Sequence, residues 1–378
     1  MNKKTLVAQH CAASDVHVKN ENHSTLAFYR GEKLTIPVVV HIVFNEDEEN
    51  ISNEQIFSQI EVLNQDFSKK NKQDFLPNDF KNIAADVNIA FELAKYDPKG
   101  KISTGITRTF TTSKDVWQEK ALLNGVQRRK VYFTNIEGRD AWDSKKYLNI
   151  WVCKMPNGKS GYATFPNQIK ADESDGIVVD YRFFGTKGVA SSNFPFHLGR
   201  TCTHEVGHFL NLQHLWGNSI SNDDCNGDDQ VNDTPKQTGP IAGCPQNPIN
   251  QCGKSTMFQN FMNYASDDCM ALFTEGQKNR MIDAVAQFRP ILNASYVAVD
   301  ELQLIDIQLF PNPASQFVSL VTPQKGTYFL INMQGQNVVK GELEAGKNSI
   351  EIAHLSSGIY QLGIVIDNRQ IIKKLSVL

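Results

Sequence analysis

Alternation between apolar runs and polar turns predicts a β-α-β order early in the chain. Residues 35–44 are almost continuously apolar, which is typical of a buried strand. After them Ile56, Ile60, Leu63 and Phe67 recur at helical spacing, so we expect a helix with one apolar face. Ser52 and Gln55 precede this face in the pattern of a capping box. Further strands are expected over 87–93, 106–111, 148–153 and 176–181.

The pattern changes twice towards the C-terminus. Residues 218–254 are rich in Asn, Asp, Gly, Pro and Cys, which predicts a loop region held by cross-links. A helix is expected over 275–288, ending at the Arg289-Pro290 step. Short alternating runs after residue 302 then predict a small all-β domain. These runs cover 317–321, 327–331, 349–352 and 360–366.

The predicted organisation follows from these changes, with a mixed sheet backed by helices in the first part and strands alone in the second. We expect a segment at 1–34, a main domain at 35–290, a linker at 291–301 and a β domain at 302–378.

Composition excludes several classes of protein. A hydrophobic content of 40% with 21% charged residues is that of a globular chain and not of a disordered one. The net charge of −3 offers no basic field for nucleic acid. No window is apolar for the eighteen or so residues of a membrane span. A signal peptide is not visible either, because Gln9 and His10 interrupt the first apolar residues.

Four of the seven cysteines, Cys225, Cys244, Cys252 and Cys269, lie close together in the chain. This clustering predicts two disulfides and an oxidising compartment, and four reduced thiols in a cytosolic protein are the alternative.

The segment 203–214 contains the motif H-E-x-x-H with a further histidine six positions on. Residues four apart share one helix face, so His204 and His208 can bind one metal ion, with Glu205 beside them. His214 reaches the same ion only if the helix ends before it. Asn211 is the expected break, because asparagine tolerates the left-handed conformation that ends helices.

Three imidazoles on zinc leave the fourth tetrahedral position for water, as in catalytic sites. Glu205 is then the expected general base, and peptide hydrolysis is the expected reaction. Histidines outside the motif, such as His41 and His197, are interpreted as satisfied residues of the core or the surface, without a role in function.

The segment downstream of the motif resembles the pappalysin family of the metzincin clan. Residues 260–270, with 273–274 and 276–277, are similar to the family's Met-turn and the helix that follows it. Upstream similarity covers 148–153, 161–163, 165–166 and 175–178. The resemblance implies a metzincin-like α+β catalytic domain with a mixed twisted sheet, a backing helix, an active-site helix and a loop-rich lower half.

The same resemblance implies roles for single residues. Met262 would lie beneath the zinc, although core packing alone would also account for it. Tyr264 would hydrogen-bond the oxyanion of the tetrahedral intermediate, a role that suits a phenol. Asn211 departs from the family's usual glycine, which matters only if the position packs against another backbone.

The family's cross-links, carried over to this chain, join Cys225 to Cys252 and Cys244 to Cys269. Related precursors carry a cysteine in a short pro-segment, and Cys11 matches it. Its thiolate could take the water's place on zinc and hold the enzyme inactive as a zymogen. A cysteine without a role in an N-terminal tail is the alternative.

Family members also bind calcium near the cross-linked loop. Asp229, Asp233 and Thr234 offer the oxygen ligands that calcium prefers, and an acidic solvated loop is the alternative. Asp268 matches a residue that, in relatives specific for basic residues, lies in the pocket for the residue after the scissile bond. A carboxylate there would favour Arg or Lys.

The C-terminal domain resembles the sorting domains of the type IX secretion system. The similar segments are 309–314, 358–360 and 373–378. The resemblance implies a β-sandwich that the secretion machinery recognises, and hence a secreted or cell-surface protein that crosses a bacterial outer membrane. A carbohydrate-binding or adhesive module is the alternative for this domain.

Together these features predict a secreted zinc endopeptidase with peptide or protein substrates. The alternative is a catalytically silent cell-surface binding protein that keeps the zinc site for structure, and the intact Glu205 argues against it.

Overall fold

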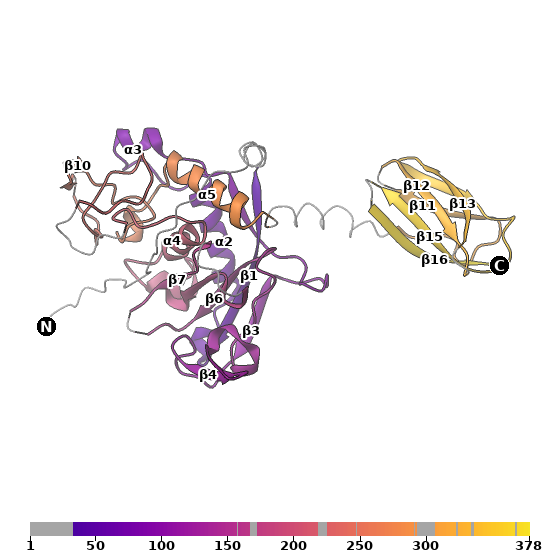
Figure 1. Cartoon of the computed structure of the whole chain (residues 1–378), viewed down its shortest axis with the longest axis horizontal. Coiled ribbons are helices and arrows are strands. Elements are labelled where there is room, and N and C mark those ends of the chain that lie inside the picture. Colours follow the sequence, from indigo (N-terminus) through magenta and orange to yellow (C-terminus); the bar gives the residue numbers. More distant parts are fainter. Residues whose placement is uncertain are drawn as a thin grey trace. The chain divides into compact units, whose positions relative to one another are not determined.

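The computed structural model describes residues 33–156, 158–166, 172–217, 225–246, 248–290, 292, 307–322, 324–333, 336–366 and 369–378. The chain divides into two compact units between residues 296 and 297, and each is described by itself (Figure 1). Apart from residues 33, 34 and 292, the predicted N-terminal segment and linker lie outside the described residues.

A mixed sheet forms the centre of the first unit. Its strands follow the order β2-β1-β6-β8-β7, and β3 also pairs with β1. The long strand β1 is parallel to β2 along its first half, to β3 along its second half, and to β6 on its other edge. Only β7 is antiparallel to its neighbour, β8. The strands are β1 (Leu34–Phe44), β2 (Ile89–Leu93), β3 (Ile106–Phe110), β6 (Leu148–Cys153), β7 (Gly161–Ala163) and β8 (Ile177–Asp180).

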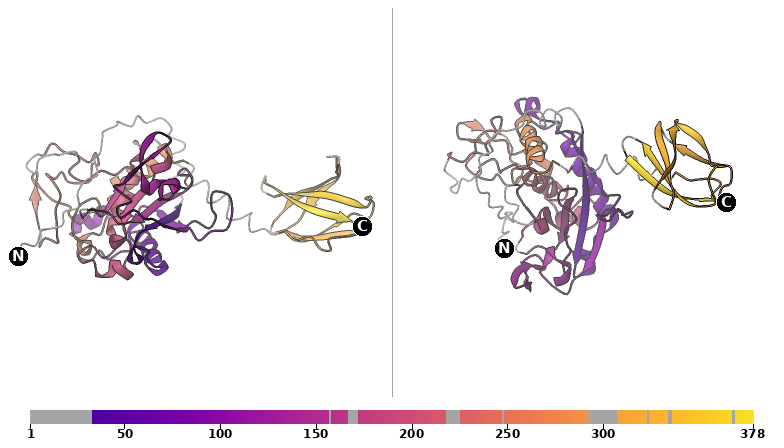
Figure 2. Two further views of the ribbon diagram at one scale, coloured as in Figure 1. Left: turned by 90° about the horizontal axis from the view of Figure 1, so that it is seen from below. Right: turned by 45° about the vertical axis from the view of Figure 1, so that its right-hand side comes forward.

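Both faces of this sheet are covered, which explains why β1 is apolar nearly throughout. Ile36, Val38 and Ile42 pack into the larger core with residues of the helices, whereas Val43 lies in a second cluster on the opposite face. The helices of the larger core are α2 (Asn53–Phe67), α4 (Arg200–Phe209) and α5 (Glu275–Phe288), and Figure 2 shows them beside the sheet.

The predicted capping box at α2 is half wrong. The Ser52 hydroxyl accepts a hydrogen bond from the Gln55 backbone N–H at 3.2 Å, as expected of an N-cap. The Gln55 side chain does not return to Ser52 but donates to the carbonyls of Tyr181 and Phe184, both at 2.9 Å. Those carbonyls come from a distant segment, so a buried tertiary contact outweighed the local one.

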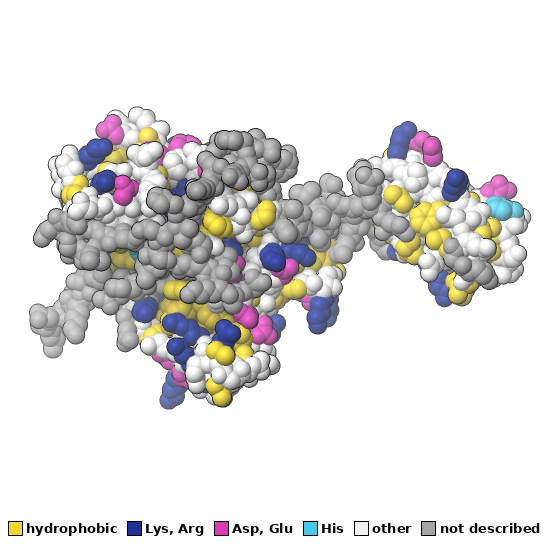
Figure 3. Space-filling model, viewed as in Figure 1, with side chains coloured by type: hydrophobic (Ala, Val, Ile, Leu, Met, Phe, Trp, Pro, Cys, Tyr) yellow, Lys and Arg dark blue, Asp and Glu magenta, His cyan; other side chains and the backbone are white. Residues whose placement is uncertain are grey.

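Smaller elements complete the first unit. A hairpin that the pattern did not predict, β4 (Lys120–Leu123) with β5 (Val126–Arg129), turns at Asn124 and Gly125, which both have positive φ. In Figure 3, Lys and Arg side chains lie beside hydrophobic ones around this hairpin. The others are α3 (Asn78–Ile83), β9 (Asn250–Gln251), β10 (Lys254–Ser255) and the 3-10 turns Asp47–Glu49, Lys130–Tyr132, Thr134–Ile136, Asp172–Ser174, Tyr181–Phe183, Gly188–Ser192 and Asp267–Cys269.

The second unit consists of β-strands, as predicted, and these strands pair antiparallel. β11 pairs with β14, and the other strands follow the order β13-β12-β15-β16. Val318 and Ile350 of the first sheet share one apolar cluster with Leu330 and Leu362 of the second, so the sheets pack face to face. The strands are β11 (Phe317–Thr322), β12 (Gly326–Ile331), β13 (Asn337–Leu343), β14 (Gly346–Glu351), β15 (Gly358–Ile366) and β16 (Arg369–Val377). Within the described residues, no helix is long and apolar enough to cross a membrane.

Candidate metal centre

Helix α4 carries the H-E-x-x-H motif and is anchored by buried polar contacts at its first turn. The Asp267 carboxylate accepts from the Leu198 backbone N–H at 2.7 Å, just before the helix begins. Asp66 of α2 accepts from the Arg200 guanidinium and, at 2.7 Å, from the Thr203 hydroxyl. Nearly all of α4 is buried, so the position of its histidines is set by the core around it.

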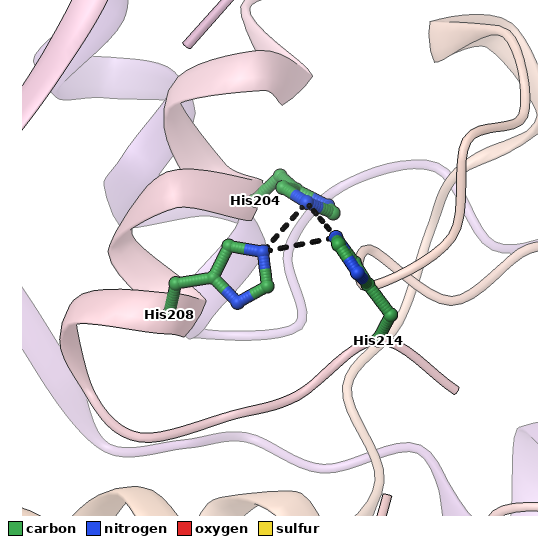
Figure 4. A group of neighbouring side chains, drawn as sticks. All are labelled: His204, His208 and His214. Atoms are coloured by element: carbon green, nitrogen blue, oxygen red, sulfur yellow. Dashed lines mark hydrogen bonds between the residues drawn. The ribbon is translucent and has the colours of Figure 1, made fainter. Parts of the chain in front are cut away.

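The three motif histidines converge on one point (Figure 4). Their Nε2 atoms lie 3.0 Å apart between His204 and His208, 3.1 Å between His208 and His214, and 3.2 Å between His204 and His214. They are the one group of three or more His, Cys, Asp or Glu side chains within the described residues that could hold a metal ion. The structure therefore brings together the predicted ligands.

The hydrogen bonds of two of these rings define their tautomers. His204 Nδ1 donates to the Phe261 carbonyl at 2.7 Å, and His208 Nδ1 donates to the Leu212 carbonyl at 2.8 Å. Burial lowers the pKa of His204 to about 4 and lowers that of His208 well below its usual value, so both rings are neutral. Their Nε2 atoms therefore present lone pairs to each other.

This donor set fits a divalent cation such as zinc. Facing lone pairs repel, and a cation between them turns the repulsion into attraction. Tetrahedral zinc with Zn–N bonds of about 2.0–2.1 Å separates its nitrogens by roughly 3.3 Å, close to the separations here. The carbonyl bonds to Nδ1 are the outer contacts that typically orient metal-binding imidazoles.

Asn211 ends the helix as predicted. Its φ is 74°, in the left-handed region. The Leu212 N–H then donates to the Gly207 carbonyl at 2.9 Å, and Arg280 Nε donates to the Asn211 carbonyl at 2.7 Å. The chain turns back at this point, which is how His214 reaches the other two histidines. The Asn211 side chain is accommodated in a buried position, so the departure from glycine is tolerated.

Met262 lies beneath α4 in full burial. A Cβ added to Gly207 would lie 2.5 Å from the Met262 sulfur, so this helix position must be glycine for the two to meet. The prediction for Met262 did not include Gly207. A glycine inside a helix is unfavourable by about 1 kcal/mol relative to alanine, and that was the available signal of close approach.

Tyr264 lies beside the histidines, with its hydroxyl 3.1 Å from His214 Nε2. The His214 ring also stacks on Trp216, with centroids 4.4 Å apart and planes 14° from parallel. Trp216, which the motif analysis missed, therefore holds the third imidazole in place where its segment has no helix to support it.

Glu205 is buried and lies against β7. A Cβ on Gly161 of that strand would lie 2.5 Å from Glu205 Oε1. The carboxylate consequently occupies the space over a glycine, beside the edge strand of the sheet.

The predicted loop region has the two expected cross-links, Cys225–Cys252 and Cys244–Cys269, each with Cα atoms 5.7 Å apart. Between residues 225 and 255, its only regular elements among the described residues are the short strands β9 and β10. Cys11 lies outside the described residues.

The three candidate calcium ligands do not share one cluster of contacts. The Thr234 hydroxyl lies 2.8 and 2.9 Å from the two carboxylate oxygens of Asp229, whose pKa burial raises to about 7. Asp233 instead accepts from the Thr274 hydroxyl at 2.7 Å and from the Gly276 N–H at 2.8 Å, at the start of α5. Asp268 is exposed, next to the disulfide-bonded Cys269.

His41 is a structural residue, as interpreted from the sequence. It is fully buried and bonded to Thr107 and Asn149 at 2.9 and 3.0 Å. The ring of His197 packs on that of Phe194, with centroids 5.3 Å apart, and its buried Nδ1 has no hydrogen-bond partner in the described structure.

Comparison with known proteins identifies the family. Residues 133–286 match the family model described as pregnancy-associated plasma protein-A, and residues 308–378 match the secretion system C-terminal sorting domain. The solved structure of Tannerella forsythia mature mirolysin with a cleaved peptide is 42% identical, covers 71% of this chain and 98% of that chain, and has a TM-score of 0.65. The chain belongs to the pappalysin family. It is a secreted or cell-surface metalloendopeptidase with a type IX sorting domain.

This pappalysin is also similar to further solved structures and curated proteins. A mutant of Tannerella forsythia promirolysin is 40% identical, covers 73% of this chain and 90% of that chain, and has a TM-score of 0.64. Extracellular metalloprotease 1 of Coccidioides posadasii is 35% identical, but the match spans 38% of this chain and only half of that relative. An extracellular metalloprotease of Arthroderma benhamiae is 28% identical over 68% of this chain and 79% of its own length.

Proposed function

We propose that this pappalysin is a zinc-dependent endopeptidase in which His204, His208 and His214 hold the metal. The observation that carries the proposal is the convergence of three buried Nε2 atoms within 3.0–3.2 Å, two of them oriented by backbone carbonyls. Zinc bound there would act as a Lewis acid and lower the pKa of water to about 7.

Glu205 is the proposed general base. It accepts a proton from the attacking water and returns that proton to the leaving amine, so the peptide bond breaks without a free charge on nitrogen. Its position next to His204 on α4 and against the edge strand β7 supports this role.

Tyr264 is proposed to donate a hydrogen bond to the oxyanion that develops on the scissile carbonyl. Its hydroxyl lies 3.1 Å from His214 Nε2, beside the proposed metal ligands, and this supports the role. Met262 supports the site through packing alone, since its sulfur touches the helix at Gly207.

Asp268 is proposed to give the enzyme a preference for Arg or Lys after the scissile bond. Its carboxylate is exposed, and both of its neighbours in the chain are fixed. Cys269 forms the disulfide with Cys244, and Asp267 accepts a hydrogen bond from the Leu198 N–H just before α4. Asp268→Ala should reduce that preference in a digested peptide library, and an unchanged cleavage pattern would exclude Asp268 as its source.

A calcium ion bound by Asp229, Asp233 and Thr234 is proposed to stabilise the loop region. Asp229 and Thr234 already lie together, and burial of the Asp229 carboxyl favours a cation beside it. Asp233 would have to exchange its contacts at α5. Calcium should raise the unfolding temperature of the wild type and not that of Asp229→Asn; equal shifts would refute the site.

Latency through residues 1–34, with Cys11 as a zinc-binding thiolate, is proposed from the family resemblance and from the pro-form of mirolysin among the similar structures. The type IX machinery would then export the chain through residues 302–378, with 291–301 as the linker. Cys11→Ala should raise the activity of the unprocessed chain, and unchanged latency would exclude the switch.

The central experiment compares wild type with Glu205→Gln and His214→Ala for zinc content and peptide hydrolysis. Glu205→Gln should keep about one zinc per chain and lose at least roughly a hundredfold in turnover. His214→Ala should lose zinc as well as activity. Full activity of Glu205→Gln would refute the mechanism. A wild type that remains free of metal after incubation with zinc would refute the site.

A further inference from the structure

Outside the metal centre, an arginine is stacked on an aromatic pair beside the edge strand. The guanidinium of Arg129, the last residue of β5, lies 4.2 Å from the ring centroid of Trp117. The Trp117 ring in turn contacts the ring of Tyr162 in β7, with centroids 5.2 Å apart. Trp117 is 3% exposed, so the platform under Arg129 is part of the core.

The charge of Arg129 is not neutralised within the described part of the chain. Its neighbour Lys130 forms ion pairs with Glu119 and Glu137, each at 3.0 Å. Arg129 forms no ion pair with a described carboxylate, and its side chain is half-exposed. A guanidinium held over a ring keeps N–H donors for an outside acceptor and loses little conformational freedom on binding one.

Strand β7 places this group beside the metal centre. β7 is the last strand in the order of the sheet, and its outer edge pairs with no other described strand. Gly161, at its start, lies against Glu205. An extended peptide with its scissile bond near Glu205 can therefore continue along β7 by backbone pairing, as peptides do on exposed sheet edges.

Successive side chains of β7 point to opposite faces of the sheet, and this decides which peptide side chains can lie near Trp117 and Arg129. Ala163 packs into the core of α4, whereas Tyr162 packs on the opposite face with Trp117. In a paired strand, a peptide residue opposite Tyr162 and on its face has its Cβ within about 5.5 Å of the tyrosine Cβ. Its side chain then lies over Tyr162, on the face of the sheet where Trp117 and Arg129 also lie.

We propose that Arg129, stacked on Trp117, is a specificity-determining residue that binds an Asp or Glu side chain of the substrate within a few residues of the scissile bond. This inference rests on the proposed endopeptidase function. It concerns a different part of the peptide from Asp268, whose charge is of the opposite sign.

The test is digestion of a peptide library by the active, zinc-loaded protein and its variants Arg129→Ala and Arg129→Glu. Wild type should cleave peptides with Asp or Glu at one position about threefold to tenfold better than peptides with Ala there, as expected of a partly exposed charge pair. Arg129→Ala should remove this ratio, mainly through KM. Arg129→Glu should reverse it, so that Lys or Arg is favoured at the same position.

Arg128→Ala is the matched control. Arg128 is adjacent and also lies over a ring, but that ring is Phe133, at 5.8 Å, whereas Arg129 lies over Trp117. It should keep the wild-type selectivity. Tryptophan fluorescence before and after unfolding checks that each variant is folded.

Two results would overturn the inference while leaving the proposed function intact. The first is that wild type prefers Asp or Glu at no position of the peptide. The second is that Arg129→Glu keeps the preference of wild type for Asp or Glu. If the proposed function itself is wrong, wild type with zinc will cleave no peptide at all, and this result is distinguishable from both of the others.

Discussion

The close contact between Gly207 and Met262 predicts that Gly207→Ala destabilises the protein, although helix propensity alone predicts that it stabilises the protein. Gly207 is inside α4. At an exposed position of a helix, a Gly→Ala substitution would stabilise the fold by about 1 kcal/mol through helix propensity. Here the added Cβ would lie 2.5 Å from the Met262 sulfur, closer than two such atoms can approach. Either the thioether or the helix that bears His208 must move.

The two effects have known sizes. Overpacking a buried site costs about 1–3 kcal/mol, so Gly207→Ala should destabilise the wild type by about 1 kcal/mol after the propensity gain. Met262→Ala removes a fully buried side chain and should cost about 2–5 kcal/mol. In the Met262→Ala background the clash is absent, so Gly207→Ala should stabilise by up to about 1 kcal/mol.

Urea unfolding of the four proteins, followed by tryptophan fluorescence at fixed free zinc, measures this double-mutant cycle. All four tryptophans precede residue 217, so the signal reports on the peptidase unit and not on the sorting domain. Zinc must be held constant because it stabilises the folded state by mass action. A Gly207→Ala effect of the same sign and size in both backgrounds would refute the role assigned to this contact.

Two further predictions concern buried polar and turn residues. Burial raises the pKa of Asp267 to about 7, so the native state holds its proton more tightly than the unfolded state, and stability should fall as pH rises from about 4 to 7. Asp267→Asn should flatten this fall in urea titrations at pH 5 and pH 8, and an unchanged pH slope would contradict the assignment. Asn211→Ala should cost about 1–2 kcal/mol and weaken zinc retention, because alanine disfavours the left-handed φ of 74°. Asn211→Gly should retain wild-type zinc content in the same dialysis assay, and a loss equal to that of alanine would mean that the side chain and not the backbone matters.

Much of the candidate site was predictable because its pattern is local. The spacing of His204 and His208 and the need for a break before His214 follow from helix geometry. The choice of Asn211 for that break follows from the tolerance of asparagine for the left-handed conformation. The element boundaries at α5 and β6 also agree with the apolar pattern, since those segments are long or fully buried. The two disulfides agree with the family resemblance.

Predictions failed or were absent where a residue's partner is distant in the chain. The Gln55 side chain donates to carbonyls more than a hundred residues away in the chain and not to the backbone of the predicted N-cap. The hairpin of β4 and β5 has little apolar alternation and was missed. Nothing in the sequence around Arg200 pointed to Asp66, with which it anchors the first turn of α4.

The sequence by itself determined which residues can bind the metal, because ligand chemistry and helical spacing are properties of a few neighbouring residues. Only the tertiary structure decided the tautomers of His204 and His208, the close approach of Met262 to Gly207, and the contact of Arg129 with Trp117. Each of these depends on atoms brought within a few ångströms by packing of segments that are far apart in the chain. Such distances are set by the whole core, and no local pattern encodes them.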